Sequence, residues 1–134
     1  MAGLTIITTA SIKHADYLKS LGANHVIDRH LSTEAAVAEI SKALDQQPLK
    51  YSVDTVTNAE TGQMVYDLLA PGGNHLMVGP DYIQNKAENK QVSVVRGWAS
   101  ADENAESVAA LYKHLTTLLE EGVIKVSTTV YTCD

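Results

Sequence analysis

The feature that most constrains this chain is a regular alternation of short apolar runs with amphipathic helical segments. The apolar runs have strand length and lie at Leu4–Thr9, His25–Asp28, Tyr51–Val56, His75–Gly79 and Val92–Gly97. Strands that alternate with helices are typical of βαβ units around a parallel sheet. We therefore predict an α/β fold with a doubly wound, mainly parallel sheet.

Capping residues and breakers place the helices between these runs. The helices are expected from Lys13 to Leu21, from a cap at Ser32 or Thr33 to about Asp45, from a cap at Asn58 to residues 70–73, and from a Ser100/Glu103 capping box to Gly122. Residues 80–91 form the one long loop, and residues 123–131 a last, edge-like strand. With no repeat or linker, residues 1–134 are expected to form a single domain.

Charge and cysteine content exclude several classes of function. The formal net charge is −6, and the basic residues are scattered, which argues against nucleic-acid and membrane-surface partners. Cys133 is the single cysteine, and the five histidines show no H-x-x-x-H pair, so no metal site is expected. No apolar stretch has transmembrane length and no signal peptide is recognisable, so we expect a cytoplasmic location.

Three segments together carry a family resemblance. They are "TTASIKHADYLKSLGANHVIDRH", "YSVDTVTNAETGQMVYDLLAPGGNHLMVG" and "LYKHLTTLLEEGVIK". In this order they resemble the nucleotide-binding half of medium-chain dehydrogenase/reductases. The closest resemblance is to the zinc-independent quinone-oxidoreductase and trans-enoyl-reductase branch, which includes fungal GroES-like and alcohol dehydrogenase-like proteins. The resemblance implies a Rossmann-like domain that binds NADP, without the GroES-like catalytic domain of the whole enzymes.

One element of that fold is missing from the sequence. A dinucleotide-binding domain begins with a strand that closes on a G-x-G-x-x-G turn, and no such glycine run occurs here. The apolar run Leu4–Thr9 matches the second strand of the fold, so the central position of the sheet is vacant. The sheet could close to the order 2-1-3-4-5, another chain could donate a strand in an oligomer, or the domain could be marginally stable. We expect closure, because the crossovers can then stay right-handed.

The resemblance implies a site for the ribose 2′-phosphate of NADPH in the turn after the first strand. Ser11 and Lys13 lie in this turn with His14 beside them, and a hydroxyl and an ammonium at a helix N-terminus favour a dianion. Residues 8–13 contain no acid, which favours NADP over NAD. Alternatively, Ser11 is only a helix cap and Lys13 a solvated charge.

Three further residues are candidates for cofactor contacts. Arg29, followed by His30, ends the second strand where relatives approach the adenosine, although a solvated loop charge is the plainer interpretation. Thr57 and Gly79 end the third and fourth strands, where the resemblance places the backbone beside the cofactor. A plain strand-ending turn explains Gly79 equally well.

Two functions follow from these observations. The first is a truncated NADP-dependent oxidoreductase that keeps part of the cofactor site and has little catalysis of its own. The alternative is a non-catalytic α/β module that binds a partner or small ligand; Trp98, the loop of residues 80–91 and the acidic surface favour it. The sequence leaves open whether the chain is an enzyme and whether it forms a homo-oligomer.

Overall fold

The computed structural model describes residues 4–56, 58–96 and 102–124, which alternate between strands and helices as predicted. The strands are β1 (Ile7–Ala10), β2 (His25–Asp28), β3 (Tyr51–Asp54), β4 (Asn74–Val78) and β5 (Gln91–Val95). The helices are η1 (Ile12–His14), α1 (Ala15–Ser20), α2 (Thr33–Leu44), α3 (Ala59–Leu68), η2 (Asp102–Asn104) and α4 (Ala105–Glu120). The chain divides into two compact units, Met1–Val95 and Arg96–Asp134.

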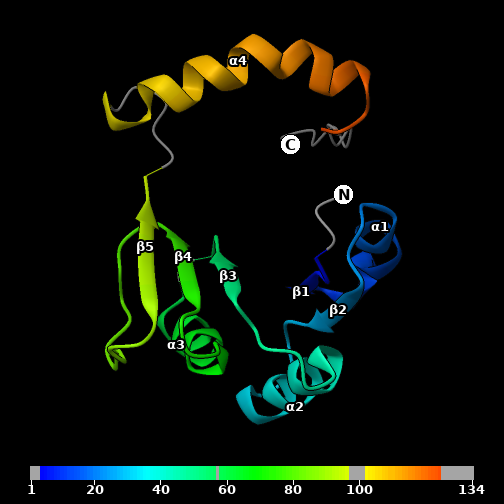
Figure 1. The fold of residues 1–134 in the computed structure, drawn as a ribbon. Helices are drawn as coiled ribbons and strands as arrows, with labels where there is room; N and C mark the ends of the chain where they lie inside the picture. Colours follow the sequence, from blue (N-terminus) through cyan, green and yellow to red (C-terminus); the bar gives the residue numbers. More distant parts are fainter. Residues whose placement is uncertain (1–3, 57, 97–101, 125–134) are drawn as a thin grey trace, which may run out of the picture. The chain divides into compact units, whose positions relative to one another are not determined.

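The first two strands form a two-stranded parallel sheet. β1 pairs with β2 from Ile7 opposite His25 to Ala10 opposite Asp28. Helices α1 and α2 both contact β2, and the ribbon shows one helix on each side of it (Figure 1). Ile27 on the strand and Ile40 on α2 are buried, which fixes α2 on this sheet by apolar burial.

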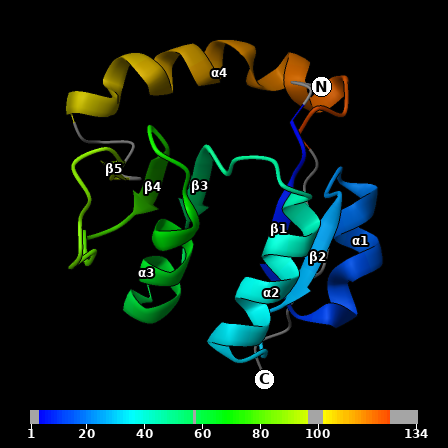
Figure 2. The same cartoon turned by 60° about the horizontal axis from the view of Figure 1, so that its bottom comes forward.

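The other three strands form a separate parallel sheet. β4 lies between β3 and β5 (Figure 1), with Ser52, His75 and Val92 aligned across the three strands. Helix α3 lies next to this sheet (Figure 2), and its Tyr66 is 1% exposed. The core cluster of this part contains Tyr66, Leu69, Met77 and Ile83.

The long loop between β4 and β5 was predicted from its polar composition, and the structure confirms it. Hydrogen bonds hold the loop against α3. The amide of Ala87 donates to the Tyr66 hydroxyl at 2.8 Å, and the amide of Gln84 donates to Oε1 of Gln63 at 3.0 Å. Ile83 from the same loop is buried in the core cluster.

Two helix caps predicted from the sequence are confirmed. The Ser32 hydroxyl accepts from the amide of Ala35 at 3.3 Å, and Oδ1 of Asn58 accepts from the amides of Glu60 and Thr61 at 2.9 and 3.3 Å. These contacts satisfy amides that have no partner within the helix.

Gly22 after α1 has φ +108°, a conformation that residues with a Cβ rarely adopt. This confirms the predicted glycine stop of the first helix.

The described strands do not confirm the predicted closure of the sheet to the order 2-1-3-4-5. β1 pairs with β2 alone, and β3 pairs with β4 alone, so each has one free edge. Alternate residues of a strand address opposite edges, which assigns the backbone of Tyr51 and Val53 to the free edge of β3. Tyr51 and Val53 are 68% and 64% exposed, so the backbone that this edge leaves unpaired is not buried. Water can therefore replace the missing strand partner.

The second unit contains η2 and α4 in its described part. Asn104 precedes α4, and its side-chain amide donates to the carbonyl of Arg96 at 2.6 Å. Ser100 of the predicted capping box and most of the predicted last strand lie outside the described residues. None of the described helices is both long and apolar enough to cross a membrane. That residues 1–134 form one domain stays a prediction.

Candidate functional site

The predicted phosphate-binding residues lie at the carboxyl end of the two-stranded sheet. Ala10 of β1 is aligned with Asp28 of β2, and the amide of Arg29 donates to the carbonyl of Ala10 at 3.0 Å. Ser11 and Arg29 therefore leave neighbouring strands at the same edge. The structure thus brings the β1 and β2 candidates together, and in open α/β sheets ligands bind at this edge.

The Ser11 hydroxyl is not used as a helix cap. Ser11 occupies the N-cap position of η1 with extended φ and ψ, but its side chain makes no capping hydrogen bond. Lys13 and His14 follow in η1 and are exposed, and no ion pair engages Lys13 among the described residues. The turn therefore presents a hydroxyl and an ammonium, which are the groups that bind phosphate.

The end of β2 carries both a cation and an acid. Nε of Arg29 donates to Nε2 of His30 at 3.4 Å, and both side chains are exposed. Oδ1 of Asp28 accepts from the amide of His30 at 3.1 Å. One oxygen of the Asp28 carboxylate is therefore occupied by a hydrogen bond within the same turn. The guanidinium of Arg29 stays at the surface.

The remaining candidates belong to the three-stranded sheet. After β3, Oδ1 of Asp54 accepts from the amide of Val56 at 2.9 Å and shapes the turn of residues 54–56. Gly79 follows β4 with φ +136°, so the turn there depends on glycine. Because Asp54 aligns with Met77, both turns leave neighbouring strands at one sheet edge. Thr57 lies outside the described residues.

A buried polar cluster lies beneath the turn of residues 54–56, and sequence reasoning missed it. His75 on β4 is 0% exposed, and its Nδ1 lies 2.7 Å from Oγ of Ser52 on β3. The ring meets Tyr66 edge-on, with centroids 6.3 Å apart. The available signal was a polar residue at matching positions inside two neighbouring apolar strands.

Two pKa values of this region depart from their usual range. Burial lowers the pKa of His75 from 6.5, against the opposing effect of the Asp54 and Asp81 carboxylates. The pKa of Asp81 is lowered chiefly by its hydrogen bond with Lys86, at 2.5 Å. His75 is therefore neutral at pH 7, beside two carboxylates.

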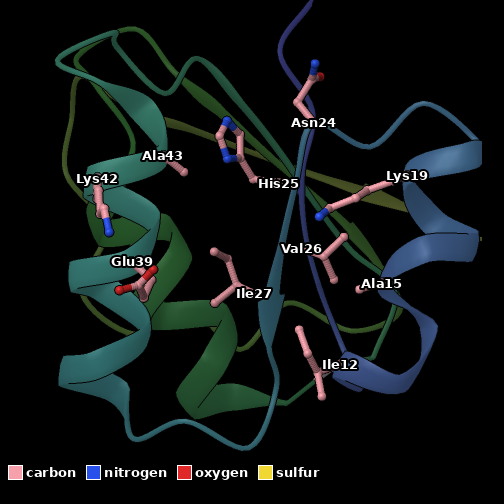
Figure 3. A pocket seen from close by; sticks show the side chains of 10 residues that line it. All are labelled: Ile12, Ala15, Lys19, Asn24, His25, Val26, Ile27, Glu39, Lys42 and Ala43. Carbon is pink, nitrogen blue, oxygen red and sulfur yellow. The ribbon is translucent and has the colours of Figure 1, made fainter.

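A cavity of about 350 Å³ opens beside β2, between α1 and α2 (Figure 3). Val26 points toward α1 and Ile27 toward α2, while Lys19 and Lys42 contribute charged ends (Figure 3). A second cavity of about 440 Å³ shares Ile12, Val26, Ile27 and Glu39 with it. Among the described residues, neither lining includes a predicted cofactor contact, so these spaces lie beside that site and not in it.

Comparison with known proteins identifies relatives of this chain. The family model described as zinc-binding dehydrogenase matches residues 1–113. The trans-enoyl reductase caaB of Aspergillus niger is 26% identical over 145 residues, covering 94% of this chain and 39% of the relative. The trans-enoyl reductase mpsG of Macrophomina phaseolina is 32% identical over 93 residues, covering 69% and 25%. The chain thus spans between a quarter and two fifths of the length of these relatives.

Solved structures match the fold over most of the chain. The CurK enoyl reductase superposes with a TM-score of 0.74 at 20% identity, covering 94% of this chain and 39% of the other. The nucleotide-binding subdomain of the enoylreductase domain of PpsC from Mycobacterium tuberculosis gives 0.67 at 22% identity, covering 91% and 72%. At this level of identity the likeness shows a Rossmann-like fold, in agreement with the predicted fold class.

Proposed function

We propose that this chain, which belongs to the zinc-binding dehydrogenase family, binds NADP through the 2′-phosphate of the adenosine ribose. Its relatives and structural neighbours match it over the nucleotide-binding domain of the medium-chain dehydrogenase/reductases. Ser11 and Lys13 hold the phosphate, with His14 and Arg29 at its border. Thr57 and Gly79 lie along the rest of the cofactor. When bound, the cofactor would supply a hydride to a substrate of the oxidoreductase.

One observation carries the proposal: in the turn after β1, the Ser11 hydroxyl makes no capping hydrogen bond and the Lys13 ammonium is exposed. A serine that served only as a cap would bond an amide of the following helix, and Ser11 does not. A site for NAD would place an acid there to accept from the ribose 2′-hydroxyl, and residues 8–13 contain none. Both facts favour a dianion over a free hydroxyl at this edge.

The remaining parts of the cofactor site require more than these residues. No glycine-rich turn occurs in the sequence, so we propose that a strand from outside the described residues supplies the pyrophosphate contact. The free edges of β1 and β3 can pair with such a strand. We also propose that the chain by itself catalyses little hydride transfer, that it needs no metal, and that it acts in the cytoplasm.

Titration of the full chain with NADP⁺ and NAD⁺ by calorimetry tests the proposal. We expect NADP⁺ to bind more tightly than NAD⁺, and Lys13→Ala to weaken NADP⁺ about tenfold while leaving NAD⁺ nearly unchanged, because a charge-assisted bond to phosphate is lost. Lys19→Ala is the matched control, since Lys19 is an exposed lysine on the neighbouring helix. Absence of saturable binding at millimolar NADP⁺ would refute the proposal and favour a non-catalytic module.

A further inference from the structure

The outer edge of β2 has no strand beside it in the described part of the chain, because β2 pairs with β1 alone. The amides of His25 and Arg29 donate to carbonyls on the β1 side at 3.1 and 3.0 Å. Successive residues of a strand address opposite edges, so the N–H and C=O of Val26 and the N–H of Asp28 point to the outer edge. The C=O of Asp28 accepts from the amide of Leu31 at 3.3 Å. The outer edge therefore offers backbone donors and an acceptor to a further strand.

The cavity of about 350 Å³ lies across this outer edge (Figure 3). Side chains of both neighbouring helices line it, namely Ala15 and Lys19 of α1 and Glu39, Lys42 and Ala43 of α2. The two helices lie on opposite sides of β2 and β1 occupies the inner edge, so a space that both helices line crosses the outer edge. The second cavity shares Val26 with the first and continues to Asp28. Together the two cavities form a groove along this edge, which we call the β2 groove.

The β2 groove has apolar side chains that are only partly covered. Ile12 of η1 lines both cavities and is 56% exposed, and Leu31 lines the second cavity and is 39% exposed. Val26 and Ile27 line both cavities and point toward α1 and α2 respectively (Figure 3). A ligand that covers these side chains removes apolar surface from water. The groove therefore combines apolar contact on both faces of β2 with unpaired backbone groups between them.

The charges differ between the two ends of the β2 groove. Lys19 and Lys42 line only the first cavity, which includes His25 at the start of β2. Asp28 lines only the second cavity, at the end of β2, and Glu39 lines both. Neither lysine takes part in a salt bridge with another described residue. An extended ligand with a carboxylate at the start of β2 and a cation at its end complements this arrangement.

We propose that the β2 groove binds an extended peptide with a free carboxyl terminus, which pairs with β2 as an antiparallel strand. The peptide carboxylate lies near Lys42 and the amino end of the peptide near Asp28, so the peptide runs opposite to β2. One peptide residue exchanges both backbone hydrogen bonds with Val26, and its neighbours place their side chains alternately toward α1 and α2. Peptide binding here is separate from the proposed binding of NADP and does not require it.

Fluorescence anisotropy of a labelled peptide, titrated with the full chain, tests the proposal. The probe is a short peptide of alternating valine and threonine, with one lysine near its labelled amino end and a free carboxyl terminus. Because the proposed contacts use backbone, carboxylate and alternating side chains, we expect saturable binding. A peptide with an amidated carboxyl terminus should bind about tenfold more weakly, because a charge-assisted contact is lost. A peptide N-methylated at alternate amides should not bind, because it cannot pair with the edge.

Variants of the chain test the same contacts from the other side. Lys42→Glu should weaken the peptide by about tenfold or more, and Lys113→Glu is the control because Lys113 is an exposed lysine on α4. Val26→Pro removes the outward N–H and should abolish binding, whereas Val26→Thr keeps that N–H and should retain it. Proline is tolerated in an edge strand where its nitrogen faces outward, and circular dichroism checks that the variant folds. If Val26→Pro does not fold, the N-methylated peptide and Lys42→Glu still decide.

Three results would overturn the proposal. They are no saturable binding at millimolar peptide, equal affinity for the N-methylated peptide, and equal loss of affinity in Lys42→Glu and Lys113→Glu. Sedimentation of the chain alone separates a peptide from a second copy as the occupant. Self-association that Lys42→Glu abolishes, without binding of the peptide, would assign the β2 groove to a second copy and refute peptide binding. A failure of NADP⁺ to bind would refute the proposed function and leave these results unchanged.

Discussion

The two sheets of the first unit differ in what they bury. The three-stranded sheet and α3 enclose Tyr66, Met77 and His75, each less than 2% exposed. The two-stranded sheet buries Ile27 and Ile40 less completely, and two cavities border β2. The predicted phosphate contacts belong to the loosely packed sheet, whereas the polar cluster belongs to the tightly packed one.

The prediction with the largest expected effect on stability removes one apolar side chain from each sheet. Met77→Ala should lower the free energy of unfolding by about 2–5 kcal/mol, because the side chain is fully enclosed and leaves a cavity. Ile27→Ala should cost about 2 kcal/mol or less, because Ile27 lines two cavities and its side chain is less closely packed than that of Met77. Urea unfolding of both variants, followed by circular dichroism, measures the two costs. An equal or larger loss for Ile27→Ala would contradict the packing difference.

The same difference explains what the sequence could predict. Strand and helix positions follow from period and caps: β2 begins at His25 and ends at Asp28 as expected, and the caps Ser32 and Asn58 act as expected. These features depend on neighbours along the chain, so local patterns reveal them.

The polar cluster depends on register between strands far apart in sequence. Ser52 and His75 meet because β3 and β4 pair with these two residues aligned. A single sequence does not specify register, so the pair looks like two unrelated polar residues in apolar strands. The predicted closure of the sheet likewise depends on pairing between β1 and β3, which lie far apart in the sequence and do not pair in the described part of the chain.

A second prediction examines how the long loop is fastened to the tightly packed sheet. Nζ of Lys90 donates to the carbonyls of Tyr66 and Asp67 at 3.2 and 2.9 Å, at the C-terminal end of α3. A cation at this end also interacts favourably with the helix dipole. Lys90→Met should lower the free energy of unfolding by about 1–2 kcal/mol, because two charge-assisted hydrogen bonds are lost. The measurement is the urea midpoint by circular dichroism.

The control for that prediction is a lysine of the same loop with a different partner. Lys86 pairs with Asp81, but its side chain is 50% exposed, so Lys86→Met should change stability by about 0.5 kcal/mol or less. If both variants lose equally, the loop is stabilised by its general charge and not by the contact with the end of α3. The tightly packed sheet would then owe less to this loop than the hydrogen bonds indicate.

The smallest expected effect compares the helix caps of the two sheets. Asn58 accepts from two amides of α3, at 2.9 and 3.3 Å, whereas Ser32 accepts from one amide of α2 at 3.3 Å. Asn58→Ala should therefore cost about 1–2 kcal/mol and Ser32→Ala about 0.5–1 kcal/mol.

Hydrogen exchange of the capped amides separates the cap from general loss of stability. Exchange of the amides of Glu60 and Thr61 should accelerate in Asn58→Ala more than that of Ala35 in Ser32→Ala, and Asn58→Asp and Ser32→Asp should restore protection because each keeps an acceptor. A larger effect at Ser32 would mean that α2 relies on its cap because its sheet is loosely packed. The difference between the two sheets would then lie in how helix ends are held as well as in how much apolar surface each sheet buries.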